Sequence, residues 1–165
     1  MIKFYLATYN NSNTMTDTII NQIKKALDGK STIDNDVNKF IREFDFTQLI
    51  NNTKFVQKKY VKDHLIKEDN YSMYAIYWGD SSYCYPHNHP DGGCILRIVS
   101  GKVLEKNYEL VDGEAKFTNE RYLIKDNVCI KYGNQLHSMT PQENTFGIHV
   151  YFPGDYKPKY FDICK

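Results

Sequence analysis

Hydrophobic positions in the first part of the chain recur at the spacing of two amphipathic helices. Thr16 or Asp17 could cap the first helix, and Asp34 or Asp36 the second. A further helical turn is expected over 47–50. Each helix would present one apolar face, made of Ile19, Ile20, Ile23 and Leu27 in the first and of Val37, Phe40, Ile41 and Phe44 in the second.

The pattern changes near residue 70, where short runs rich in β-branched and aromatic residues begin. Turn signals containing Gly, Asn or Asp separate these runs. Helices followed by many short strands predict a mainly β, α+β chain: an antiparallel barrel of jelly-roll type over 71–165, after a helical segment over 1–70. The expected strands are 71–78, 82–85, 94–99, 102–108, 121–124, 128–132 and 145–152.

Composition bounds the class of protein. With 165 residues, 41% of them apolar, the chain can bury one core and is short for two, so we expect a single domain, 1–165. The net charge of +1 lacks the footprint of a nucleic-acid or anionic-membrane binder, and small molecules are the expected partners. Apolar runs too short for a bilayer and no signal-peptide pattern indicate a cytoplasmic protein, which we expect to be a monomer.

Histidines give the chain its candidate chemistry. His87 and His89 lie two residues apart, and on an extended strand both imidazoles would point to one face. His137, beyond the predicted strand over 128–132 and a glycine turn, is the candidate third ligand. His64 lies in a polar segment and is expected to be solvated. The four cysteines fit no Cys-x2-Cys spacing and are expected to be thiols, with Cys94 as a possible exception.

Three imidazoles without a carboxylate would have a chemical consequence. Neutral ligands leave a bound Fe²⁺ with its full charge, so an incoming thiol could bind as thiolate. Three protein ligands also leave positions open for a substrate and O₂. Imidazole suits zinc, nickel and copper as well, and oxygen chemistry at an open site favours iron among them.

The segment 85–101 resembles a known metal motif. Its His-x-His-x4-Cys-x6-Gly pattern is similar to the first motif of cupins, with cysteine in place of the usual glutamate, and it looks like the motif of the cysteine dioxygenase family. The resemblance extends weakly over nearly the whole chain. Its other parts are Phe40-Ile-Arg-Glu-Phe44, Tyr60-Val-Lys62, Trp78-Gly79, Gly133-Asn-Gln-Leu-His137 and Gly147-Ile-His149-Val-Tyr151-Phe-Pro153.

This resemblance implies a cupin barrel in which Fe²⁺, held by His87, His89 and His137, supports the oxidation of L-cysteine by O₂ to cysteine sulfinic acid. It also implies a thioether crosslink between Cys94 and Tyr151 beside the iron. Tyr151 would then act near the substrate or O₂, and His149 would orient it. A buried free cysteine and a core tyrosine remain the alternative for this pair.

Several positions depart from the family's pattern. Lys62, after Tyr60, stands where the family has an arginine that binds the substrate carboxylate, and lysine lacks the planar two-pronged fork. Glycines replace a histidine at Gly93 and a serine at Gly147, and the family's C-terminal extension is missing, which could widen the pocket. A dioxygenase for a cysteamine-like thiol or an N-terminal cysteine, and a metal-binding cupin without turnover, therefore remain alternatives; in either case Lys62 could be a solvated surface residue.

Overall fold

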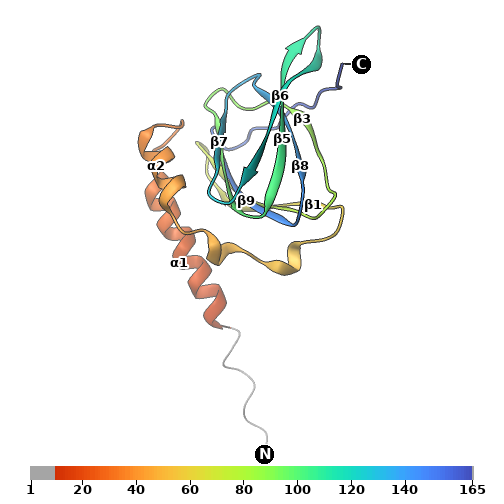
Figure 1. Cartoon of the computed structure of the whole chain (residues 1–165). Helices are drawn as coiled ribbons and strands as arrows, with labels where there is room; N and C mark the ends of the chain where they lie inside the picture. Colours follow the sequence, from red (N-terminus) through yellow and green to blue (C-terminus); the bar gives the residue numbers. More distant parts are fainter. Residues whose placement is uncertain (1–9, 165) are drawn as a thin grey trace, which may run out of the picture.

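The computed structural model describes the backbone of residues 10–164 and the side chains of residues 16–164. Two helices and two short 3-10 turns precede the strands (Figure 1). The helical elements are α1 (Asn10–Leu27), α2 (Asn35–Glu43), η1 (Thr47–Leu49) and η2 (Asn52–Lys54). The strands are β1 (Tyr60–Lys67), β2 (Ser72–Trp78), β3 (Cys84–His87), β4 (Cys94–Ser100), β5 (Lys102–Val111), β6 (Glu114–Ile124), β7 (Val128–Lys131), β8 (Leu136–Pro141) and β9 (Thr145–Tyr151).

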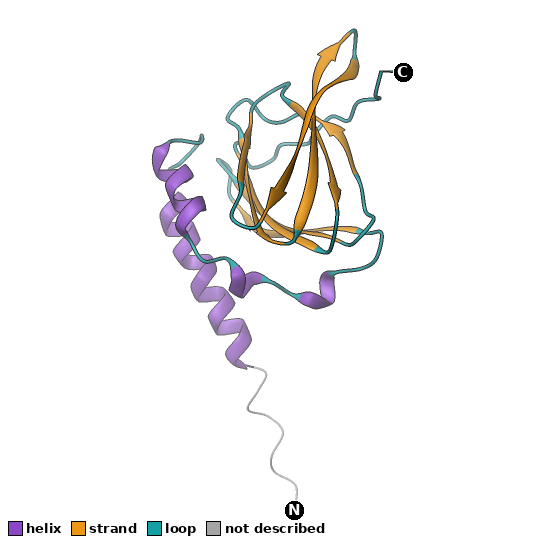
Figure 2. Cartoon of the chain, viewed as in Figure 1, coloured by secondary structure: helices purple, strands orange, loops and turns teal. Residues whose placement is uncertain are grey.

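The strands form two antiparallel sheets that face each other as a barrel (Figure 2). One sheet has the order β1-β2-β9-β4-β7, and the other has the order β3-β8-β5-β6. Neighbours in each sheet are mostly distant in sequence, as the predicted jelly-roll arrangement requires. The expected mainly β, α+β fold is thus confirmed.

The inner strands of the five-stranded sheet, β2, β9 and β4, are largely buried on both faces. Met73, Ala75 and Ile148 point outward from this sheet, into a core that also contains the apolar faces of α1 and α2. The alternate positions Ile76 and Leu96 point into the barrel. Side chains alternate between the two faces along each strand, and two residues that pair directly across neighbouring strands point to the same face.

Arg97 ties the second helix to the barrel. Its side chain leaves β4 and donates hydrogen bonds to the carbonyl oxygens of Ile41 (3.0 Å) and Phe44 (2.7 Å) at the end of α2. The guanidinium also pairs with Asp126 at 2.6 Å. Arg97 therefore satisfies backbone carbonyls that the helix end leaves without partners.

Some elements differ from the sequence-based expectation. Helix α1 begins at Asn10, before Thr16 and Asp17, whereas Asp34 caps α2 as expected, accepting the N–H of Val37 at 2.8 Å. Strand pairing begins at Tyr60 rather than near residue 70. Strand β8 and the first part of β6 were also not expected. No helix of the described residues has the length and apolar character needed to cross a membrane.

The C-terminal segment lies beside strand β3, at the edge of the four-stranded sheet. Tyr160 forms an isolated antiparallel bridge with His87. The N–H of Phe161 donates to the carbonyl oxygen of Pro86 at 2.9 Å, and the N–H of Asn88 donates to that of Lys159 at 3.1 Å. This segment therefore covers an edge that would otherwise expose backbone donors and acceptors.

Candidate metal centre

The three predicted histidines meet inside the barrel. His87 ends β3, His137 lies directly opposite it on β8, and His89 follows in the loop after β3. All three are buried, and one ring nitrogen from each lies within 4.8 Å of the other two. The structure thus brings together the ligand set that the His-x-His spacing and His137 predict.

Oxygen partners fix which nitrogen of each ring carries the proton. The Nδ1 atoms of His87 and His89 lie 2.8 and 3.0 Å from the carbonyl oxygens of Tyr85 and Gln135. The Nδ1 atom of His137 lies 2.8 Å from the carboxylate of Glu105. Since these oxygens can only accept, each Nδ1 donates, and each Nε2 keeps a free lone pair.

The inward nitrogens fit a cation. The Nε2 atoms of His89 and His137 are 3.2 Å apart, and with both rings protonated at Nδ1 no proton lies between them. Two lone pairs this close repel each other unless a positive ion or a donor lies between them. A metal ion that accepts imidazole nitrogen, with each outer N–H held by a fixed acceptor, matches this arrangement.

Burial keeps these histidines neutral. It lowers the pKa of His87 to about 3, with a further contribution from the nearby His137. Burial likewise lowers the pKa of His89 and of His137, although the Glu105 carboxylate partly opposes the shift for His137. Neutral imidazoles are the form that binds a metal ion.

Glu105 is a candidate functional residue that the sequence alone did not indicate. It is fully buried on β5 and contacts His137, Lys131 (3.3 Å) and Arg121 (2.6 Å). These positive and donor groups hold the pKa of Glu105 well below its ordinary value, despite its burial. Glu105 is thus an ionised carboxylate that orients a metal ligand from outside the ligand set.

Glu105, Cys129 and His137 form a second group of closely spaced ligand atoms. In this group the Cys129 thiol donates to Glu105 at 3.1 Å, and burial raises the pKa of that thiol. Lys131 and Arg121 already neutralise the carboxylate. Internal hydrogen bonds and ion pairs therefore account for this group without a metal.

Cys94, Tyr151 and Lys62 lie on the inner face of the five-stranded sheet. Cys94 and Tyr151 are direct partners across β4 and β9, so their side chains share that face. Burial raises the pKa of Cys94 to about 12, against opposing effects of a hydrogen bond with Tyr151 and of the Lys62 charge. The two residues of the predicted crosslink are thus neighbours.

Lys62 is not a fully solvated surface lysine. Its Nζ lies 3.8 Å from the centre of the Tyr74 ring and 4.7 Å from that of the Tyr151 ring. Burial lowers the pKa of Lys62, while the thiols of Cys94 and Cys84 raise it. Its neighbour Tyr60 is 38% exposed and packs against Trp78, with ring centres 6.1 Å apart.

His149 occupies the same inner face as Tyr151, but it is not hydrogen-bonded to it. Their rings are nearly parallel with centres 6.2 Å apart, and neither ring nitrogen of His149 has a partner among the described residues. A Cβ atom at Gly147 would lie 3.0 Å from the indole of Trp78. The Trp78 ring therefore fills the space that a serine at 147 would need.

Gly93 does not open the site. Its φ of +101° favours glycine, and a Cβ atom there would lie 2.6 Å from Ile33 and 2.7 Å from Tyr132.

A thiol that the sequence analysis did not single out, Cys84, lies on strand β3 with His87, and its Sγ is 3.6 Å from Nδ1 of that histidine. Burial raises the pKa of Cys84 to about 11.

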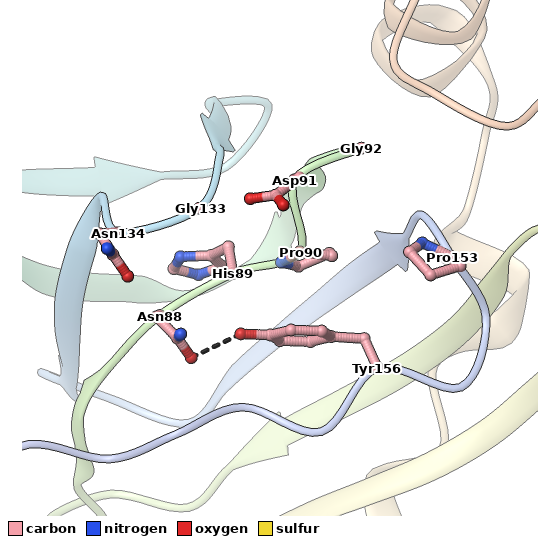
Figure 3. Close-up of a pocket in the computed structure, with 9 residues that line it drawn as sticks. All are labelled: Asn88, His89, Pro90, Asp91, Gly92, Gly133, Asn134, Pro153 and Tyr156. Atoms are coloured by element: carbon pink, nitrogen blue, oxygen red, sulfur yellow. Dashed lines mark hydrogen bonds between the residues drawn. The ribbon is translucent and has the colours of Figure 1, made fainter.

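A pocket of about 390 Å³ adjoins the centre at His89 (Figure 3). The β3–β4 loop contributes Asn88 and Asp91, and the C-terminal segment contributes Tyr156, whose hydroxyl donates to Asn88 at 2.5 Å. The ring of Tyr156 also lies parallel to that of Tyr151, with centres 6.5 Å apart. The pocket thus lies next to both a metal ligand and the Tyr151 side chain.

Comparisons with known proteins give the class of fold. No family model matches the sequence, and no curated protein matches it. Similar solved structures include a protein with a double-stranded β-helix domain from Klebsiella pneumoniae, at 14% identity, covering 71% of this chain and 93% of that one with a TM-score of 0.52. A cupin superfamily protein from Desulfitobacterium hafniense has 10% identity, coverage of 74% and 95%, and a TM-score of 0.52.

An oxalate oxidase in complex with the substrate analogue glycolate is also similar, at 13% identity, covering 67% of this chain and 58% of that one with a TM-score of 0.53. At such identities the likeness concerns the fold. The chain is a cupin-type double-stranded β-helix with a candidate three-histidine metal centre in its barrel.

Proposed function

We propose that this protein is an iron(II)-dependent thiol dioxygenase whose preferred substrate is L-cysteine. The observation that carries the proposal is the position of Lys62. It lies next to the Cys94–Tyr151 pair on the inner face of one sheet, and its charge acts on His87 in the opposite sheet. Among the described residues, no carboxylate pairs with its ammonium group. A partly buried cation without an anion favours a substrate that brings its own carboxylate.

In such a reaction each residue around the centre would have a separate role. His87, His89 and His137 would hold the metal ion, and Lys62 would bind the carboxylate of the substrate. Iron(II), when bound, would supply Lewis acidity toward a thiol and open positions for substrate and O₂. The Tyr151 hydroxyl would donate a hydrogen bond at the reacting sulfur. Both atoms of O₂ are transferred to that sulfur, so that R–SH and O₂ become R–SO₂⁻ and H⁺.

His149 has a different expected role from that suggested by the resemblance. Burial lowers its pKa well below the ordinary value, and the nearby Lys62 charge acts in the same direction. A neutral imidazole with two unpartnered nitrogens can accept from and donate to a bound molecule. We propose that it binds substrate or an ordered water inside the barrel.

The test is an assay of the metal-loaded protein. Metal-free protein is reconstituted anaerobically with Fe²⁺ or, as a control, with Zn²⁺, and O₂ uptake and sulfinate formation are measured with L-cysteine and with cysteamine. We expect one sulfinate per O₂ from L-cysteine, with Fe²⁺ alone. Faster oxidation of cysteamine would move the assignment to another thiol substrate. Tight metal binding without O₂ uptake would indicate a binding protein instead.

A further inference from the structure

A second pocket of about 390 Å³ lies between the edges of the two sheets. Strand β6 forms the edge of the four-stranded sheet, and β7 forms one edge of the five-stranded sheet. Its polar lining consists mainly of cationic and amide side chains, namely Asn107, Asn119, Arg121, Lys131 and Gln135. This pocket is separate from the one beside His89, since the two share no lining residue.

The amide oxygens that line this pocket are already used. Lys131 donates to the side-chain oxygen of Asn107, and the Asn107 amide donates to that of Asn119 at 2.9 Å. The backbone N–H of Tyr132 donates to the side-chain oxygen of Gln135 at 2.9 Å, which also fixes the orientation of that amide. Each amide acceptor thus has a donor from the protein.

The polar groups of this pocket that have no partner among the described residues are hydrogen-bond donors. Arg121 uses Nε on Glu105 at 2.6 Å, and its half-exposed side chain also contacts the Cys129 thiol. No oxygen of the described residues accepts from its two terminal nitrogens. The side-chain nitrogen of Gln135 likewise has no acceptor among residues 10–164. A ligand that satisfies this set must be an acceptor.

The charge of the pocket indicates the same kind of ligand. Two cations, Arg121 and Lys131, surround a single carboxylate, that of Glu105, and no acidic side chain lines the pocket. The local balance is therefore one excess positive charge. A guanidinium whose two terminal nitrogens lack an oxygen acceptor among the described residues matches the paired oxygens of an oxyanion.

We propose that this pocket binds a small oxyanion, and that the bound anion strengthens metal binding at the three-histidine centre. The link is Glu105, which contacts the two cations on one side and Nδ1 of His137 (2.8 Å) on the other. An anion bound to Arg121 and Lys131 weakens the attraction of these two cations for Glu105. The Glu105 carboxylate then becomes a stronger hydrogen-bond acceptor for His137. A stronger acceptor at Nδ1 makes Nε2 a better metal ligand.

Binding is tested with the metal-free protein and three probes: inorganic phosphate, acetate and methanesulfinate, each titrated at low salt by calorimetry. We expect binding of at least one probe, weakened roughly 10- to 100-fold in Arg121→Gln, as loss of charge-assisted hydrogen bonds implies. The matched control is Lys116→Gln, also on β6 and paired with a glutamate, but remote from the pocket. Equal affinity in both variants, or no binding of any probe, would overturn the site.

The link to the metal centre is tested by a second measurement. Co²⁺ affinity is determined with and without the tightest probe in the unmodified protein, in Arg121→Gln and in Glu105→Gln. We expect the anion to tighten Co²⁺ binding in the unmodified protein alone, and Co²⁺ to tighten anion binding by the same factor. The arms with phosphate, acetate and sulfinate show which oxyanion is preferred. Anion binding that leaves Co²⁺ affinity unchanged would refute the link.

Discussion

His137 has the most specific support of the three candidate ligands, because a charged carboxylate rather than a backbone carbonyl holds its outer nitrogen. Removing a ligand should cost more metal affinity than the roughly 10- to 100-fold typical of a change in such a supporting group. We expect His137→Ala to lose stoichiometric Fe²⁺ or Co²⁺ in metal analysis of the purified protein. The exposed His64→Ala is the control, and full metal content in His137→Ala would mean that the third ligand is misassigned.

On the proposed function, we expect Lys62 to determine which thiol is preferred. In Lys62→Ala, loss of a charge-assisted contact worth about 1.5–3 kcal/mol should lower kcat/KM for L-cysteine by roughly 10- to 100-fold. Lys62→Arg should retain or improve turnover, because the guanidinium fork suits a carboxylate. Cysteamine turnover should be nearly indifferent to both changes, and the exposed Lys59→Ala serves as control. If Lys62→Ala leaves L-cysteine kinetics unaltered, Lys62 does not bind substrate.

The proposed function makes Cys94 and Tyr151 the partners of a covalent bond. The two residues face each other across β4 and β9, and both are buried. We expect turnover with iron and O₂ to join the cysteine sulfur to the tyrosine ring with loss of two hydrogens. Intact mass and peptide mapping would detect the joined peptide, which Cys94→Ser should lack. Only free Cys94 after prolonged turnover would reject the crosslink and leave the metal centre intact.

At the residue scale the sequence could predict which histidines meet, since the His-x-His spacing indicates one pair and the resemblance adds His137. The strand assumed for both His87 and His89 ends at His87, and His89 lies in the loop. The role of Glu105 was not predicted, although the residue lies within the predicted strand 102–108. Its position, two residues after Val103, is an inward one, and a charge at an inward position of a strand is the signal that could have revealed it. Its partners Arg121 and Lys131 come from other strands, and their proximity requires the sheet order.

At the scale of elements, Arg97 should contribute strongly to stability, because it attaches helix α2 to the barrel. Arg97→Met removes two charge-assisted hydrogen bonds to the end of α2 and the pair with Asp126. We expect the free energy of unfolding to fall by about 2–4 kcal/mol, since two carbonyls also lose their donor. Urea unfolding measures this change. Arg42→Met on the exposed side of α2 is the control and should cost much less.

Two strands that the sequence did not predict, β1 and β8, share a physical reason. Strand β1 mixes Lys62, Asp63 and His64 with its apolar residues, because it lies at a sheet edge and reaches toward a polar site. Strand β8 is short, carries His137 and Ser138, and ends at Pro141. Functional polar residues at inward positions break the alternation by which strands are recognised.

For the whole molecule, the buried histidines predict acid sensitivity of the metal-free protein. Burial lowers the pKa of His87 to about 3 and also lowers that of His89, His137 and His149. Above the unfolded pKa of about 6.5 these groups are neutral in both states, so stability is fully present there. Below that pH the histidines bind protons in the unfolded chain but stay neutral in the folded protein. The free energy of unfolding therefore falls as the pH decreases toward 3.

Each histidine should then lower the free energy of unfolding by about 1.4 kcal/mol per pH unit below its unfolded pKa. Denaturant unfolding between about pH 7.5 and pH 5.5 measures the slope. His149→Phe should reduce the slope more than His64→Gln, because burial lowers the pKa of His149 well below its ordinary value, whereas His64 is exposed and the same effect on its pKa is smaller. A flat profile for the metal-free protein would contradict the neutral, buried state of these rings.

The C-terminal segment has a consequence for how the protein behaves in concentrated solution. Residues 159–161 pair with β3 and so cover the sheet edge that carries His87. Removing them would leave a ready template for strand pairing between molecules. The same few residues that flank His87 should thus also limit aggregation, and a variant with this pairing disrupted should aggregate more readily than the unmodified protein.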